Sequence, residues 1–217
     1  MNFALSLLIA FIMGQVLRLR YQRHHIQLLS RHLATMQLEK HMETLTTTYS
    51  RAIQEADPSR QEQIFATVTQ TEQAVAAQAQ RLAEAFEHET ENSTLMGVWA
   101  YNLPFLTSLF PSMKRDFRKL LYIHAAGFRY VADNAPNWDA KTRAYHFSAE
   151  LYLFQHSCHW FCRSRPVADA RLMVRHKVDH KKVIDSVSPP THKAYTQWLT
   201  NTKSPQYELT PRSWTLL

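Results

Sequence analysis

The chain begins with seventeen residues, positions 1–17, that include no charged side chain. Arg18, Arg20 and Arg23 follow directly. As a helix this stretch spans about 25 Å, slightly less than the roughly 30 Å hydrocarbon core of a bilayer, and long arginine side chains that reach the interface lengthen the effective span. The pattern therefore predicts a single transmembrane anchor over residues 1–18.

Two other interpretations of this stretch are open, a cleaved signal peptide and a buried or interfacial helix. A signal peptide normally has positive charge before its apolar run and a small-residue cleavage site after it, whereas here the arginines follow the run. Because arginine-rich flanks stay on the cytoplasmic side, we expect the N-terminus outside and about 200 residues in the cytoplasm, at the inner membrane.

Residues 19–92 show a helical pattern that continues from the anchor. Apolar side chains recur every three or four positions from Gln22 to Ala56, with a slip in phase after Met36. Asp57 and Pro58 then suit the N-cap and first position of a second helix, which we expect to end near His88. The pattern predicts a helical hairpin or a coiled-coil-like rod, with an ordinary pair of helices in a bundle as the alternative.

Residues 93–217 read as a helical domain rich in aromatic residues. The segment from Leu95 to Phe110 is hydrophobic but contains Pro104, so we interpret it as an interfacial segment or an oligomer contact. Four further helices are predicted, and the second is apolar on two sides, as a central helix would be. They run from Pro111 to about Ala132, from Trp138 to about Ser164, from Val167 to about Asp185 and from Thr191 to Thr200. The predicted fold class is all-α.

Composition and charge narrow the function. Only three glycines occur in 217 residues, which argues against glycine-rich phosphate loops and dinucleotide folds. Residues 1–35 carry a net charge of +4, residues 36–100 carry −6, and residues 101–217 carry +9. The basic C-terminal half could therefore meet lipid headgroups or nucleic acid.

One set of residues has the spacing of a metal site. Cys158 and Cys162, the only cysteines, are followed after thirteen residues by His176 and His180. Two cysteines and two histidines at such spacings are typical of zinc sites. The alternative is two thiols that pack in the aromatic core, because Cys158 lies on the apolar stripe of its predicted helix. We expect the packing outcome and therefore no cofactor, with zinc as the one alternative.

A second spacing concerns RNA. Helical ribonucleases of the HEPN class carry an arginine, four to six residues, and then a histidine, and Arg175 and His180 fit this spacing. In that interpretation the two side chains would polarise the 2′-hydroxyl and phosphate of RNA, although several other arginine–histidine pairs in the chain have similar spacing.

No other spacing indicates a nucleophile or a pair of catalytic carboxylates. We therefore expect a membrane-anchored structural or interaction protein rather than an enzyme. Such a protein would be a homo-oligomer or an accessory subunit of a larger membrane complex, and an RNA-binding or RNA-cleaving effector is the alternative.

Overall fold

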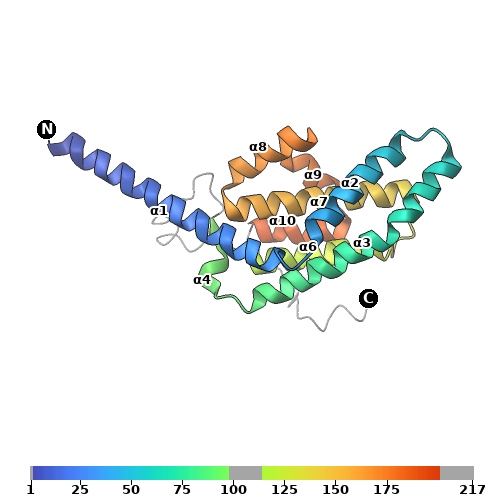
Figure 1. Ribbon diagram of the computed structural model, residues 1–217, viewed down its shortest axis with the longest axis horizontal. Coiled ribbons are helices and arrows are strands. Elements are labelled where there is room, and N and C mark those ends of the chain that lie inside the picture. Colours follow the sequence, from blue (N-terminus) through green and yellow to red (C-terminus); the bar gives the residue numbers. More distant parts are fainter. Residues whose placement is uncertain (1, 98–113, 201–217) are drawn as a thin grey trace.

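The computed structural model describes residues 2–97 and 114–200, and within these ranges the chain is almost entirely helical (Figure 1). The predicted all-α class is confirmed. The helices are α1 (Asn2–Leu33), α2 (Leu38–Gln54), α3 (Pro58–Glu87), α4 (Glu91–Thr94), α6 (Phe117–Ala132), α7 (Ala140–Cys162), α8 (Arg165–His176), α9 (His180–Ser186) and α10 (Pro189–Thr200). Strands β1 (Leu95–Gly97) and β2 (Lys114–Asp116) form a short antiparallel pair, in which Met96 lies opposite Arg115.

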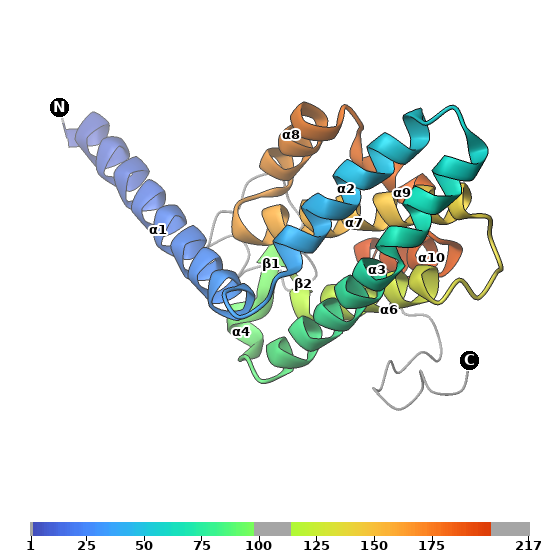
Figure 2. The same cartoon turned by 45° about the vertical axis from the view of Figure 1, so that its right-hand side comes forward.

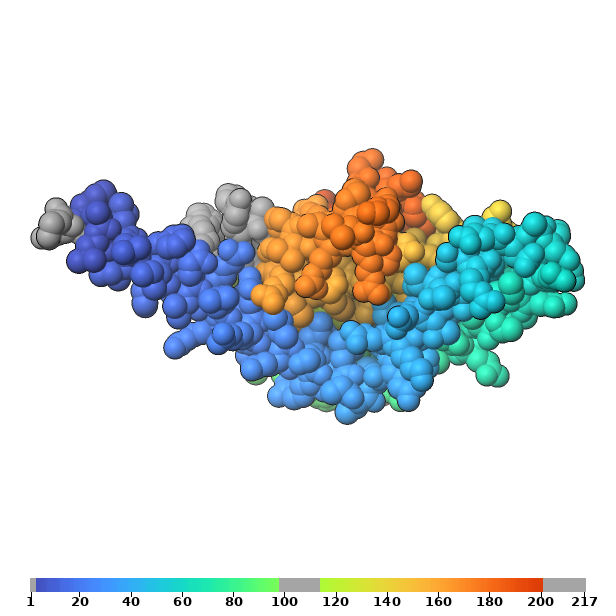
Figure 3. Space-filling view, turned by 45° about the horizontal axis from the view of Figure 1, so that its top comes forward, coloured from blue at the N-terminus to red at the C-terminus, as the bar shows by residue number. Residues whose placement is uncertain are grey.

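The first half of α1 projects from the helices of the body (Figure 3). Its apolar side chains are exposed, for example Phe3 at 78% and Phe11 at 64%. Among the described residues this is the one helix long and apolar enough to cross a membrane. The expected apolar N-terminal helix is therefore present, and it continues well beyond residue 18.

The second half of α1 is packed against the body. Leu28 and Leu29 are buried, and the His25 ring stacks on Phe161 of α7 with 4.3 Å between ring centroids. The His25 Nδ1–H donates to the Phe161 carbonyl oxygen at 2.9 Å, and Arg163 Nη1 donates to Gln22 Oε1 at 2.9 Å. The exposed arm and the docked segment are thus parts of one continuous helix.

A turn at residues 34–37 separates α1 from α2, where a continuous helix with a phase slip was expected. The slip in phase falls at this turn, so the apolar stripes before and after it belong to two separate helices. The predicted start of α3 is confirmed: the Asp57 carboxylate accepts from the Ser59 N–H at 2.9 Å, and Pro58 is the first helical residue. The helix ends at Glu87, beside the predicted His88.

The α2–α3 hairpin does not stand apart as a rod. Helix α3 lies along α6, and α2 packs against both α3 and α7 (Figure 2). The seam residues Leu38, Met42, Leu45 and Tyr49 are buried in the same core as the C-terminal helices. The coiled-coil-like rod is therefore not confirmed.

Several helix boundaries after residue 110 differ from those predicted. Helix α6 begins at Phe117, capped by Asp116, because residues 114–116 pair with β1 instead. Asp139 caps α7 through the Lys141 and Thr142 N–H groups, whereas Asn137 has a positive φ of 58° in the preceding turn. Asparagine tolerates this left-handed geometry, so Asn137 forms part of the turn before α7 and does not cap the helix.

The predicted helix from Val167 to Asp185 is in fact two helices. Lys177 ends α8 in the left-handed conformation, with φ 56°, and Asp179 caps α9 through the Lys182 N–H at 2.8 Å. The last helix starts at Pro189 rather than at Thr191, since proline is well suited to a first turn. Most of the hydrophobic segment 95–110, and the chain after residue 200, lie outside the described residues.

Candidate functional site

Helices α7, α8 and α9 meet where the chain reverses direction twice. The first reversal, at residues 163–164, sets α8 against the end of α7, and the second, at residues 177–179, returns α9 to α7. As a result His156 of α7, Asp169 of α8 and His180 of α9 come together, although they are up to 24 positions apart in sequence.

These three side chains form a compact polar cluster. Each offers one ligand atom, and these atoms all lie within 4.8 Å of one another. The His156 Nε2–H donates to Asp169 Oδ1 at 2.7 Å, and His180 Nδ1 lies 3.8 Å from the same oxygen. The two imidazole rings are nearly parallel, with centroids 3.8 Å apart. Such an arrangement can be held together by hydrogen bonds, or it can bind a cation.

The surroundings of the cluster are aromatic and mostly closed to solvent. His156 and His180 are buried, while the Asp169 side chain is 43% exposed. A 3.0 Å hydrogen bond joins His180 Nε2 to the hydroxyl of Tyr195 on α10. Trp160 packs edge-on against both histidines, and the Arg165 guanidinium lies over its ring. Of the three side chains in the cluster, that of Asp169 is therefore the most exposed to solvent.

Burial and neighbouring charge shift the protonation of the cluster. Burial would raise the pKa of Asp169, but the hydrogen bond from His156 and the nearby imidazoles lower it further, so its net pKa is below the ordinary value. Burial, together with His156 and Arg165, lowers the pKa of His180 to about 3. At neutral pH the cluster therefore contains an ionised carboxylate beside a neutral His180 imidazole.

The structure does not bring the four residues predicted from spacing as a zinc site together as one group of ligands. Only His180 belongs to the cluster, and the described residues contain no other group of three metal-ligating side chains. His176 stacks on Tyr152 and is hydrogen-bonded to Gln155 Oε1 at 3.0 Å. Burial raises the pKa of Cys162 to about 11 and that of Cys158 well above its ordinary value, so neither thiol is prepared as a thiolate ligand.

Arg175 and His180, the pair with ribonuclease-like spacing, also lie in different surroundings. Arg175 is exposed at the end of α8, whereas His180 is buried and directed toward Asp169 and Tyr195. The turn at Lys177 between them is what separates their directions.

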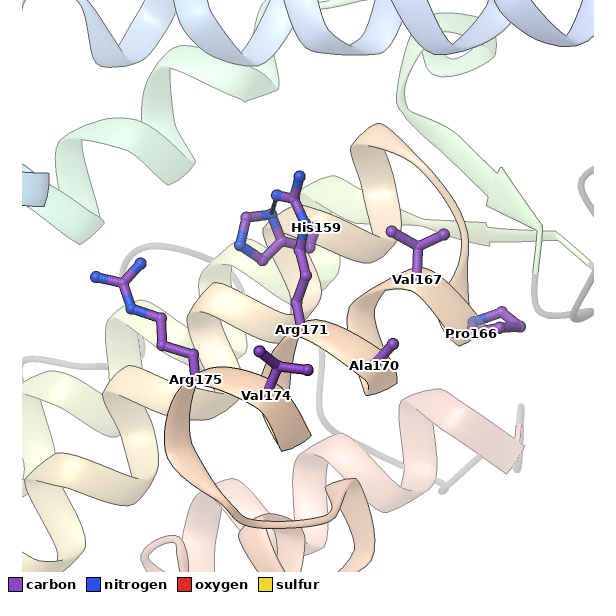
Figure 4. A pocket seen from close by; sticks show the side chains of 7 residues that line it. All are labelled: His159, Pro166, Val167, Ala170, Arg171, Val174 and Arg175. Atoms are coloured by element: carbon purple, nitrogen blue, oxygen red, sulfur yellow. Dashed lines mark hydrogen bonds between the residues drawn. The ribbon is translucent and has the colours of Figure 1, made fainter.

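An open groove runs along the other side of α8 (Figure 4). It has a volume of about 590 Å³ and is mainly apolar. Its lining residues are His159, Pro166, Val167, Ala170, Arg171, Val174 and Arg175. Arg171 Nη1 donates to His159 Nδ1 at 3.0 Å, and burial together with Arg171 lowers the pKa of His159 to about 4. The groove thus presents an apolar floor with two arginines beside it and no acidic lining residue.

Sequence reasoning missed His156 and Asp169 as partners of His180. The twelve residues between His156 and Asp169 resemble no short ligand motif. The second reversal, which brings His180 to them, depends on Lys177, and lysine gives no turn signal in sequence. The available signal was weak: Asp169 is an acid in a predicted helix that follows a histidine-rich one. Comparison with known proteins adds nothing further, since no protein-family model, curated protein or solved structure matches the chain.

Proposed function

We propose that this protein is a single-pass membrane protein whose anchor helix fixes a helical domain at the cytoplasmic face of the inner membrane. The observation that carries the proposal is the division of α1 into an exposed apolar half and a docked half. An exposed apolar surface of this length in water would be costly, because about 25 cal/mol is lost for each Å² of apolar surface left in water. A bilayer removes that cost.

The arginines support the orientation. Arg18, Arg20 and Arg23 lie where the apolar half ends, and Gln22, in the same turn, already contacts Arg163 of the body. In the proposed orientation the positive charges stay in the cytoplasm with the domain. The docked half of α1 also argues against removal as a signal peptide, because the helix runs without interruption from the apolar segment into the core.

The helical domain would provide a protein–protein interaction surface, either in a homo-oligomer or as an accessory subunit of a larger membrane complex. The groove beside α8 is the surface that best fits this role. Val174, which lines the groove, is 73% exposed, and Arg171 and Arg175 place positive charge beside it. Apolar surface bordered by arginine is typical of protein interfaces.

Topology provides the test. A reporter that is active only outside the membrane and one that fluoresces only in the cytoplasm are each fused to either terminus, and the fractionated membranes are washed with alkaline carbonate. We expect the protein to stay in the membrane, with the N-terminal fusion active outside and the C-terminal fusion fluorescent. Release by carbonate, or an outside C-terminus, would contradict the proposal. Intact mass of the purified chain distinguishes an anchor from a cleaved signal peptide.

A further inference from the structure

We propose that His156, Asp169 and His180 bind a divalent first-row transition-metal ion, Zn²⁺ foremost, at the junction of α7, α8 and α9. This site shares only His180 with the four residues whose spacing suggests zinc. It is independent of the proposed membrane role, since all three ligands lie on helices of the folded body.

The geometry is close to what a metal needs. Zinc binds imidazole nitrogen at about 2.0–2.1 Å and carboxylate oxygen at about 2.0–2.2 Å, so two ligand atoms at tetrahedral angles lie about 3.3–3.5 Å apart. The measured separations of 2.7 Å and 3.8 Å from Asp169 Oδ1 lie on either side of this value. The two imidazole rings are now nearly parallel, so binding of one ion by all three atoms would also require the side chains to rotate.

The chemistry of the three ligands also suits a divalent cation. Two neutral imidazoles and one carboxylate are the ligands of many zinc and non-haem iron sites that keep a position open for water. The 3.8 Å separation between His180 Nδ1 and Asp169 Oδ1 is too long for a hydrogen bond. A cation between these two atoms would contact both, and coordination by His156 would require its ring proton to move from Nε2 to Nδ1.

The surroundings provide a supporting contact and an entry route. A metal-bound histidine usually has its second ring nitrogen held by a hydrogen bond, and Tyr195 provides that contact to His180 Nε2 at 3.0 Å. The half-exposed Asp169 lets an ion reach the otherwise buried imidazoles. The buried His156 Nδ1 has no hydrogen-bond partner among the described residues, so this ring is held by its hydrogen bond to Asp169 and by packing against His180 and Trp160.

The test uses the full-length chain in detergent. The protein is stripped with a chelator and dialysed, zinc affinity is measured by competition with a chromophoric chelator, and metal content is measured by mass spectrometry. We expect one zinc per chain, and at least a tenfold weaker affinity for Asp169→Asn, which keeps the size of the side chain but removes its charge. Circular dichroism checks that the variant remains folded.

Matched variants separate the two donor sets. Cys162→Ser and His176→Gln should retain wild-type zinc affinity, whereas a site of two cysteines and two histidines would lose affinity in both. Co²⁺ bound in place of zinc should give visible d–d bands without an intense thiolate charge-transfer band. Failure of the wild-type chain to retain zinc, unchanged affinity of folded Asp169→Asn, or loss of affinity in Cys162→Ser would each overturn the proposal.

Discussion

At the scale of single residues, Glu150 shows how the fold alters a carboxylate. Glu150 lies fully buried on α7, where its Oε1 accepts from the Ser188 N–H at 3.1 Å and the Ser188 hydroxyl at 2.7 Å, just before α10. Its Oε2 would lie 2.6 Å from a Cβ at Gly127, so only glycine leaves room for it on α6. Burial raises the pKa of Glu150 to about 7, although the hydrogen bonds from Ser188 and Thr191 oppose the rise.

This shift predicts a pH dependence of stability. Because the folded-state pKa lies above the unfolded value, the stabilisation from a protonated Glu150 is complete below about pH 4.5 and is lost as pH rises through about 7. The loss for a shift of this size is about 3 kcal/mol. We expect Glu150→Gln to remove this component of the pH dependence, as measured by denaturant unfolding in detergent between pH 4.5 and 8.

The matched control is Glu43→Gln, which removes an exposed carboxylate from α2. It should keep the wild-type pH profile. A Glu150→Gln variant with the same slope as the wild type between pH 4.5 and 7 would show that Glu150 stays ionised in the folded protein.

At the scale of elements, the sequence predicts those helix ends that depend on local chemistry. Asp57 and Pro58 mark the start of α3 because a carboxylate and a proline satisfy the first turn whatever packs against it. The end of α8 was missed because Lys177 takes a left-handed conformation that lysine rarely adopts. For the same reason only one residue of the polar cluster, His180, was among the candidate metal ligands predicted from the sequence. The contact between His180 and Asp169 depends on the turn at Lys177.

Helix α1 has two halves that differ in burial, and the sequence pattern marks the boundary between them only weakly. None of its described side chains up to Leu19 is buried, and from Gln22 onward one face is buried against α7 and near α3. Its last turn is held by Glu89, which accepts from Arg31 Nη2 at 2.6 Å and from His32 Nε2 at 2.8 Å. A helix apolar all round and then on one face indicates a change of environment along its length.

Two truncations test this division. A chain that begins at Leu17 should leave the membrane fraction and remain folded, because none of the removed described side chains is buried. A chain that begins at Ala34 also loses the buried His25, Leu28 and Leu29, and each leucine contributes about 1.5–3 kcal/mol. We expect its thermal unfolding midpoint to fall sharply, as followed by circular dichroism. Equal midpoints for the two truncated chains would mean that the docked half of α1 adds nothing to the core.

At the scale of the whole molecule, distant segments share one interior. Tyr49 on α2 donates to Glu72 on α3 at 2.5 Å, and Arg143 on α7 lies 3.3 Å from the other oxygen of Glu72. Burial raises the pKa of Glu72, against the effects of Tyr49 and Arg143. Such contacts explain why the hydrophobic periodicity predicted the α2–α3 hairpin but not its packing against the C-terminal helices. An apolar stripe shows that one face of a helix is buried, but it does not show which helix covers that face.

The α8 groove is an apolar surface feature outside the anchor, and Val174 is one of the residues that line it. If the protein assembles through the groove, Val174→Glu should place a charge in the contact and lower the mass of the detergent-solubilised complex, measured by light scattering. The change should leave the monomer folded, since Val174 is 73% exposed.

The control for this prediction is Ile53→Glu, which introduces the same charge at another exposed aliphatic position. Ile53 is 51% exposed near the end of α2, in the hairpin rather than in the groove. Its complex should keep the wild-type mass. If the two variants behave alike, whether both dissociate or neither does, the groove is not the specific contact, because a charge at an interface disrupts association through local desolvation and not through net charge.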